Sequence, residues 1–347
     1  MRFSSKPPLA YCGIDLHAWM LDVCILNHDG AIMVHQHFKA NPETFLQVIA
    51  PYRDDLVVAV ECLFTWDGLA DLCMREGLAL VLGPALDMTA IQGGKAQHDR
   101  MDAQKIAALL RGGMLPQAYV YPAAMRATRA LLRRRGHLMR TRAELLTHIH
   151  HPTRQDNLPE RGKKLAAKAH RHGGAERFAD PAVQKRIAVD LALMGHDDER
   201  LRDVERSILK AATPHNAHTR YLLRTVPGIG ELLSLGRLDE LHEIQRFPRV
   251  QDFVSSGRLV TCAKASAGKR DGTSGATIGN ASLTGAVSEA AVLFLRANPA
   301  GQPDLGRLEK KHGNGKALTV LAHKLARAVY AMGQRHTAFK MPTFLTG

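Results

Sequence analysis

At residues 11–17 the chain reads YCGIDLH, a short β-forming run that carries one acidic residue, Asp15, near its middle. Two further β-rich runs follow at residues 21–27 (LDVCILN) and 31–38 (AIMVHQHF), and an Asp-Gly pair at residues 29–30 separates them. Asp-Gly between two such runs is a strong signal for a tight hairpin. The start of the chain therefore predicts three antiparallel strands.

Helical and apolar segments then alternate. Helical patterns cover residues 41–52, 65–76 and 102–111, and the apolar runs LVVAV and LALVL occupy residues 56–60 and 78–82. Continuous apolar runs of this length are typical of central buried strands. Three antiparallel strands followed by alternating helices and strands is the order of the ribonuclease-H-like (RuvC-like) fold, parts of which other α/β folds share. We predict an α/β domain of this class over residues 1–120.

Four acidic residues stand where this fold would bring them together. Asp15 lies within the first strand, Glu61 directly follows LVVAV, and Asp99 and Asp102 lie three residues apart where the amphipathic helix begins. Four carboxylates at one sheet edge would repel one another strongly without cations. Oxygen ligands suit Mg²⁺ or Mn²⁺, and two such ions about 3.5–4 Å apart stabilise the attacking and leaving oxygens of a phosphodiester. The four acids therefore predict a metal-dependent catalytic site.

Most of these carboxylates also have a structural interpretation. Asp102 could cap its helix, Asp99 could be a solvated loop charge, and Glu61 could cap the helix near Thr65. Asp15 is the hardest to explain in this way, because a charge within a buried strand is costly unless something pairs with it. The concurrence of four acids favours the metal site.

The charge of the chain indicates a polyanionic partner. Its 347 residues include 47 Lys and Arg against 33 Asp and Glu, which gives a net charge of +14. Such an excess is typical of nucleic-acid-binding proteins, with a basic enzyme as the alternative. No apolar run has the roughly 18–20 residues of a membrane span, and the N-terminus lacks a secretory signal. The 5 cysteines form no CxxC pair, so we expect a reducing cytoplasm rather than disulfides or a zinc finger.

The middle of the chain, residues 121–215, is predicted to be a basic helical spacer. Helices are expected at residues 122–149 and 181–212, where apolar residues repeat as in coiled coils. An antiparallel helical hairpin that could dimerise is the expected product. The first helix carries a run of arginines that would repel itself, so contact with phosphate is favoured over a solvated face. The candidate contacts are Arg126, Arg129, Arg133, Arg134 and Arg135.

The C-terminal domain, residues 216–347, is predicted to be mainly helical. The sequence PGIG at residues 227–230 resembles the turn of a helix–hairpin–helix module, in which Gly228 and Gly230 would let backbone N–H groups face a phosphate. A tight structural turn is the alternative. The Gly-rich segment SAGKRDGTSGATIGN, residues 266–280, predicts a loop that places a hydroxyl and the cations Lys269 and Arg270 beside a phosphate, or else a plain surface loop.

These motifs resemble a known family. GIDLH, VEC before a helix and HDRMDAQKIA resemble the Asp-Glu-Asp-Asp set of the DEDD insertion-sequence transposases, which are related to RuvC-type Holliday-junction resolvases and to Piv/MooV DNA invertases. The residues that match are Asp15, Glu61, Asp99 and Asp102. Family members often carry Lys-Thr-Asp or Lys-Asn-Asp before the last pair of acids, where this chain has Gln97-His98-Asp99. Residues 257–291 resemble the C-terminal transposase domain, and the likeness extends from about residue 11 to 335.

The resemblance implies a site-specific DNA recombinase with a nucleophilic serine and a covalent phosphoserine intermediate. Ser266 matches the family serine best by its distance to Gly279-Asn280, although the usual Ser-Gly is Ser-Ala-Gly here, and Ser274 is the rival. The resemblance also implies a Mg²⁺ or Mn²⁺ cofactor, DNA ends and a target site as partners, and a guide RNA encoded by the element. A dimer or tetramer in the bacterial cytoplasm, at the nucleoid, is expected.

Two other functions remain open. The first is a metal-dependent junction resolvase or nuclease that uses water, in which the serines would play no chemical part. The second is a nucleic-acid-binding protein without catalysis, in which Asp15 could be replaced without any change of activity.

Overall fold

The computed structural model describes residues 8–62, 65–84, 99–159, 165–211, 217–260, 262–266, 269–274 and 279–346. The chain divides into two compact units, Met1–Ala123 and Ala124–Gly347, and each is described here by itself. Within the residues described, no helix combines the length and the apolar character that a membrane crossing requires.

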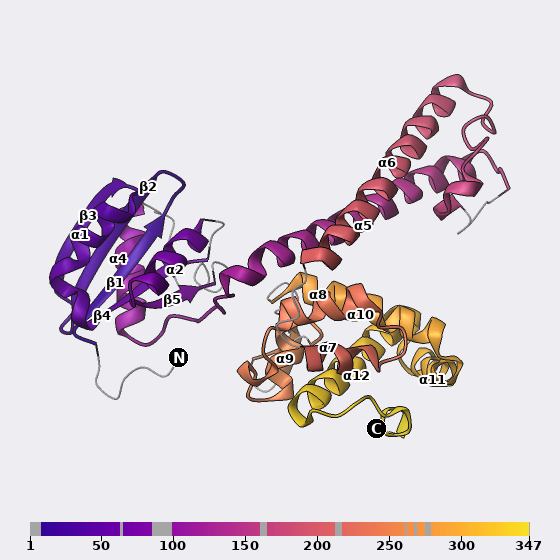
Figure 1. Ribbon diagram of the computed structural model, residues 1–347. Coiled ribbons are helices and arrows are strands. Elements are labelled where there is room, and N and C mark those ends of the chain that lie inside the picture. Colours follow the sequence, from indigo (N-terminus) through magenta and orange to yellow (C-terminus); the bar gives the residue numbers. More distant parts are fainter. Residues whose placement is uncertain are drawn as a thin grey trace. The chain divides into compact units, whose positions relative to one another are not determined.

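The first unit is built on a five-stranded sheet with strand order β3-β2-β1-β4-β5 (Figure 1). The strands are β1 (Ala10–Leu16), β2 (Met20–Asn27), β3 (Ile32–Lys39), β4 (Leu56–Glu61) and β5 (Ala79–Gly83). The first three strands pair antiparallel, whereas β4 runs parallel to β1 and β5 runs parallel to β4. The three predicted antiparallel strands are therefore confirmed, and the mixed sheet is consistent with the predicted ribonuclease-H-like class.

Helices lie on both faces of this sheet. The helical elements of the unit are α1 (Pro42–Ile49), the 3₁₀ turn η1 (Ala50–Asp55), α2 (Trp66–Arg75) and α4 (Asp99–Arg111). On one face Ile14 and Val58 pack in a cluster with apolar residues of α1 and α2, such as Phe45. On the other face Ala59 packs in a cluster with Ile106 of α4. The central strands are buried on both sides, as their continuous apolar runs predict.

Gly13 allows α4 to lie directly on β1. A Cβ atom at Gly13 would lie 2.1 Å from the carbonyl oxygen of Ala103 and 2.3 Å from the backbone nitrogen of Ala107. Both alanines are fully buried. Only a residue without a side chain fits at this crossing, and the close approach brings the first turn of α4 to the end of β1.

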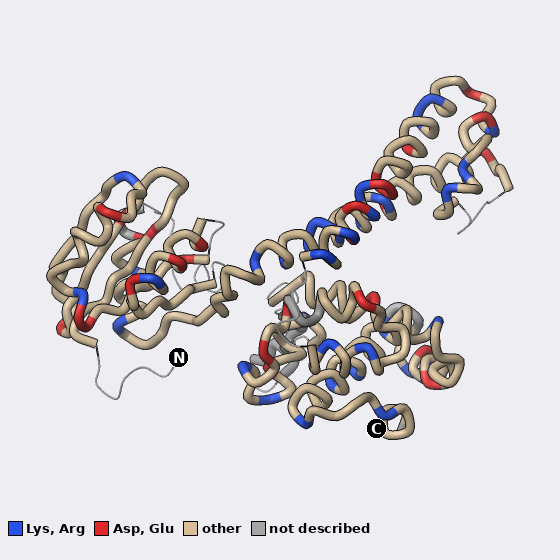
Figure 2. The backbone as a smooth tube through the Cα atoms, viewed as in Figure 1, with Lys and Arg blue, Asp and Glu red and all other residues tan. Residues whose placement is uncertain are grey.

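The second unit begins with two long helices, α5 (Ala123–Gln155) and α6 (Pro181–Ala211), with a short 3₁₀ turn, η3 (Lys168–His170), between them. Arg135 forms an ion pair with Glu205, and Arg142 with Asp198, so residue numbers rise along one helix as they fall along the other. Figure 2 shows Lys and Arg positions close to Asp and Glu positions along these two helices. The predicted antiparallel hairpin is therefore present.

The first helix continues past residue 149, where the sequence predicted its end. Pro152 lies inside it and lacks the N–H group that would donate to the carbonyl oxygen of His148. The guanidinium of Arg186 on α6 donates to that oxygen instead, at 3.4 Å. The partner helix thus compensates for the proline.

The rest of the unit is mainly helical, as predicted. Its elements are α7 (Ala217–Arg224), α8 (Glu231–Leu241), η4 (Ile244–Arg246), α9 (Val250–Ser256), β6 (Cys262–Ser266), β7 (Lys269–Ser274), α10 (Ala281–Ala297), η5 (Pro299–Gly301), α11 (Gln302–His312), α12 (Asn314–Arg335) and α13 (Met341–Thr346). Phe253, Phe294 and Leu325 are among the buried residues of one apolar core shared by these helices.

One prediction for this unit was wrong. The Gly-rich segment that starts at Ser266 is not a single loop, because β6 and β7 form a two-stranded antiparallel hairpin. The register shifts between Lys264, which pairs with Gly272, and Ala265, which pairs with Arg270, so Asp271 is the extra residue at that point of the ladder. Within β6 and β7 the segment places one glycine, Gly272, so its glycine content does not prevent the two strands from pairing.

Candidate active site

Three of the four predicted acids come together at one edge of the sheet. Asp15 is the penultimate residue of β1, Glu61 is the last residue of β4, and Asp102 lies in the first turn of α4. Ile14 pairs with Val60 across the parallel strands, so Asp15 and Glu61 come next on adjacent strands. Burial raises the pKa of Glu61, and the charges of Asp15 and Asp102 raise it further. Each of the two aspartates is thus close enough to Glu61 to repel it.

The fourth acid, Asp99, is the first residue of α4, one turn before Asp102. Its side chain lies outside the described part of the chain. Residues three apart on a helix share a face, so Asp99 is expected to accompany Asp102.

Two basic side chains accompany these carboxylates. The Nε2 atom of His17 lies 3.3 Å from Oδ2 of Asp15, and Nζ of Lys105 lies 3.1 Å from Oδ1 of Asp102. Asp15 itself is only 6% exposed. Such partners reduce the cost of keeping these carboxylates charged in a partly buried site.

Sequence reasoning missed two residues of this site, Asp22 and His37. Asp22 on β2 is the register partner of Asp15, and His37 on β3 is the register partner of Asp22. Directly paired residues project from the same face, so Glu61, Asp15, Asp22 and His37 form a row across four strands. Nδ1 of His37 lies 2.7 Å from Oδ2 of Asp22, which is 2% exposed. The available signal was an acidic residue inside the apolar run LDVCILN.

The donor set fits a divalent cation in its chemistry. All the acids offer oxygen ligands, which Mg²⁺ and Mn²⁺ prefer, and their mutual repulsion favours a cation at the same edge. Among the side chains that the structure describes, no three acidic, histidine or cysteine groups are gathered closely enough to hold a metal ion as they stand.

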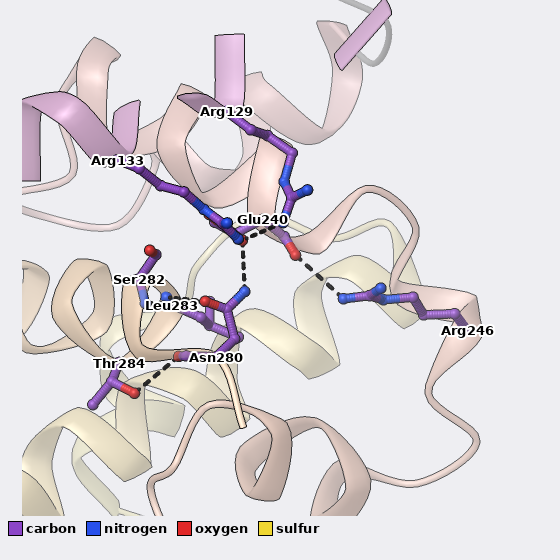
Figure 3. A network of polar contacts seen from close by, with 8 residues as sticks. All are labelled: Arg129, Arg133, Glu240, Arg246, Asn280, Ser282, Leu283 and Thr284. Carbon is purple, nitrogen blue, oxygen red and sulfur yellow. Dashed lines mark hydrogen bonds and ion pairs between the residues drawn. The ribbon is translucent and has the colours of Figure 1, made fainter. Parts of the chain in front are cut away.

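The basic residues of α5 are largely engaged inside the protein. Figure 3 shows Arg129 and Arg133 converging on Glu240 of α8, with distances of 2.9 Å from Arg129 Nη2 to Oε2 and 3.0 Å from Arg133 Nε to Oε1. Burial raises the pKa of Glu240, but its hydrogen bond with Arg133 and the charges of both arginines outweigh that effect, so the pKa is lowered overall. Glu240 is therefore a charged group within the fold.

Asn280 extends this network to the start of α10. Its Nδ2 atom donates to Oε2 of Glu240 at 2.5 Å. Its Oδ1 atom accepts hydrogen bonds from the backbone N–H groups of Ser282 and Leu283, which makes it the N-cap of the helix (Figure 3). Asn280 thus connects α10 to Glu240 of α8. It also connects α10 to α5, because Glu240 binds Arg129 and Arg133.

The other predicted phosphate contacts on α5 differ in environment. Arg135 pairs with Glu205 and also lies 3.5 Å from Glu289. Arg126 is half-buried, and Arg134 is exposed and pairs with no described residue. Contact of these arginines with nucleic acid stays a prediction, and Arg134 is one of the exposed residues that it concerns.

The PGIG turn joins α7 to α8. Gly228 has a φ of +84°, and a Cβ there would lie 2.4 Å from the carbonyl carbon of Leu293 on α10. Gly230 is exposed, with nothing within 4 Å of the place where its Cβ would be. Gly228 is therefore required by packing and backbone conformation, whereas Gly230 leaves an open approach to the turn. Phosphate binding there stays a prediction.

The two candidate serines lie at opposite ends of the β6–β7 hairpin. Ser266 ends β6 and pairs with Lys269, the first residue of β7, whereas Ser274 ends β7 and pairs with Cys262, the first residue of β6. A strand rises by about 3.3 Å per residue, so roughly 13 Å of strand separates the two positions. At this separation the two serines cannot both contact one phosphate, so they are alternative candidates for the nucleophile.

Two family models match this chain. A model described as "Transposase", of the DEDD type of the IS110 family, matches residues 12–152, and a model described as "Transposase IS116/IS110/IS902 family" matches residues 220–304. The first range contains Asp15, Glu61, Asp99 and Asp102, and the second contains the PGIG turn and both serines. No curated protein gives a significant match to the sequence.

Proposed function

Because this chain carries IS110-family transposase domains, we propose that it cuts and rejoins the DNA strands of an insertion sequence. The observation that carries the proposal is the position of three carboxylates: Asp15 and Glu61 come next after the paired residues Ile14 and Val60 on adjacent strands, and the charges of Asp15 and Asp102 both act on Glu61. These residues come from a strand, a neighbouring strand and a helix that are far apart in the sequence.

We assign to Asp15, Glu61, Asp99 and Asp102 the binding of Mg²⁺ or Mn²⁺. A divalent ion held there would supply the polarisation of the phosphodiester and would favour loss of a proton from the attacking hydroxyl. The chain's own contribution is to position the ligands. Gly13 allows α4 to approach β1, and the parallel pairing of β1 and β4 sets Asp15 beside Glu61.

We assign the nucleophile to Ser266, with Ser274 as the alternative. A serine hydroxyl needs activation to attack at neutral pH. The serine oxygen gives up its proton and bonds to phosphorus, while the bond from phosphorus to the oxygen of the leaving strand breaks and that oxygen takes up a proton. The strand is then held as a phosphoserine ester. Attack by a strand hydroxyl on this ester reverses the step and rejoins DNA without an external energy source.

We propose DNA ends, a target site and a guide RNA as partners. The net charge of +14 and the exposed Arg134 support contact with nucleic acid. A guide RNA would select the target by base pairing, while the protein would bind the backbone of the paired strands. The family resemblance supports this part of the proposal, together with a dimer or tetramer.

The test is to trap a covalent adduct on a suicide DNA substrate that contains an end of the element. The parent protein and Ser274→Ala are expected to form the adduct in Mg²⁺, whereas Ser266→Ala and Asp15→Asn are expected to form none. Mass spectrometry of the adduct identifies the serine.

Three other results would contradict parts of this proposal. An adduct on Ser274 would transfer the role of nucleophile to that residue. Cleavage without an adduct that Ser266→Ala retains would instead identify a nuclease that uses water. The protein would be a nucleic-acid-binding protein without catalysis if the parent and Asp15→Asn bound DNA equally well and neither cleaved a strand.

A further inference from the structure

An exposed tryptophan lies beside the candidate active site. Trp19 is 83% exposed, in the turn that joins β1 to β2 and four residues after Asp15. Tryptophan carries a large apolar surface and is rarely left in water to this extent. Neither the core of the unit nor the proposed catalytic set uses it, so its exposure calls for an explanation.

The turn that carries Trp19 is held by hydrogen bonds. The backbone N–H of His17 donates to the carbonyl oxygen of Met20 at 3.0 Å, and the N–H of Ala40 donates to the carbonyl oxygen of Trp19 at 2.9 Å. The backbone at Trp19 is thus tied both to its own turn and to the end of β3. The exposed indole is therefore attached to a backbone that is held in place.

The surroundings of the turn suit a nucleic-acid strand. Lys39 is exposed and is the register partner of Met20, the residue that follows Trp19. His17 lies on the other side of the tryptophan in the sequence and reaches Asp15 with its ring. An aromatic ring, a cation and the proposed metal-binding carboxylates therefore gather at one end of the sheet.

We propose that the β1–β2 turn binds an unpaired nucleotide of a single strand, with Trp19 stacking on its base and Lys39 close to its phosphate. The inference rests on the proposed function, which places the phosphodiester to be cut at Asp15. Aromatic side chains bind single strands by stacking, with little preference for sequence, because every base has a π face. Bases within a duplex are already stacked on each other. The site therefore selects an unpaired nucleotide next to the cleavage position.

Fluorescence can test this directly, because the chain has 2 tryptophans, Trp19 and Trp66. In the full-length Trp66→Phe variant, the emission of Trp19 alone is followed without divalent ions during titration with a short oligothymidylate. Quenching is expected with the single strand, and a much smaller change with a duplex of the same length.

Affinity is measured in parallel from the anisotropy of a labelled oligothymidylate. Trp19→Ala is expected to weaken binding about tenfold or more, and Trp19→Phe, which keeps an aromatic ring, to remain within about threefold of the parent. Met74→Ala serves as the matched control, because Met74 is also well exposed on the same unit (64%) and is expected to leave binding unchanged.

Several results would overturn the inference. One is binding of the oligothymidylate with no change in Trp19 emission and no loss in Trp19→Ala. Another is an emission change that depends on protein concentration without DNA, which would assign Trp19 to a contact between copies of the chain. A parent protein that binds neither the single strand nor the duplex would contradict the proposed function itself, a result distinct from the first.

Discussion

Asp15 and Asp22 face each other across β1 and β2, and His37 holds Asp22 from the next strand. Two carboxylates directly opposite in a sheet destabilise it unless cations balance them. The sheet therefore keeps a concentration of negative charge at the edge where the proposed metal ligands end. That arrangement costs stability and favours a divalent ion.

Removing the charge of Asp22 tests whether its carboxylate favours a divalent ion at the neighbouring ligands. Asp22→Asn keeps the size of the side chain and an acceptor oxygen for His37. We expect its affinity for Mn²⁺, measured by calorimetry, to fall about three- to tenfold, since a negative charge one residue away from the ligands is lost. Asp29→Asn, in the exposed β2–β3 turn, is the control and should bind Mn²⁺ as the parent does. Equal affinities for both variants would contradict the prediction.

Glu61 should make the fold less stable at neutral pH than at acid pH. Its folded pKa is raised above the ordinary 4.5, so its contribution is favourable below that value and is lost as the pH rises through the folded pKa. Glu61→Gln is therefore expected to raise Tm by about 1–3 °C at neutral pH without divalent ions, and to have no effect below pH 4.5. Thermal melts at the two pH values provide the measurement, and a lower Tm at neutral pH would contradict the prediction.

Gly13 should tolerate no side chain. Gly13→Ala places a methyl group within van der Waals distance of the α4 backbone, so we expect the free energy of unfolding in urea to fall by about 2–4 kcal/mol, with Mn²⁺ affinity reduced as α4 shifts. The matched substitution is Gly68→Ala on α2, where nothing lies within 4 Å. Alanine favours a helix at that position and should stabilise by about 0.5–1 kcal/mol. A Gly13→Ala protein as stable as the parent would show that α4 does not press on β1.

Substitution of Arg129 should lower stability, whereas substitution of Arg134 should weaken nucleic-acid binding without lowering stability. Arg129→Ala leaves Glu240 buried with one partner fewer and is expected to cost about 2–4 kcal/mol of unfolding free energy. Arg134→Ala is expected to change stability by less than about 0.5 kcal/mol and to lower the salt dependence of DNA binding by about one ion. Urea unfolding and binding at several salt concentrations measure the two effects. Loss of stability in Arg134→Ala, or none in Arg129→Ala, would contradict this division.

The sequence predicted those parts of the structure that local patterns determine. Apolar runs predicted β4 and β5, and an Asp-Gly pair predicted the β2–β3 hairpin. An acidic residue within the first strand and another directly after LVVAV predicted the place where Asp15 and Glu61 meet. Asp22 was missed because its importance comes from its register opposite Asp15, which only the paired strands reveal.

The arginines of α5 show the same limit at longer range. The acceptor of Arg129 lies 111 residues away in the sequence, and that of Arg135 lies 70 residues away. Within the sequence around α5, the basic residues have almost no acidic neighbours, and this pattern predicts contact with phosphate groups. The fold supplies the counter-charges from α6, α8 and α10, which a linear reading cannot bring together.

Asn280 acts as a mechanical joint. Its amide nitrogen donates a hydrogen bond to Glu240, and its amide oxygen accepts one in the first turn of α10. Glu240 in turn pairs with Arg129 and Arg133 of the long helix α5. It also stands six residues after Ser274, so the segment that carries both serines ends at this anchor. A rotation of α5 relative to α8 would therefore be transmitted through Asn280, and through the pair that Arg135 forms with Glu289, to α10, where that segment ends.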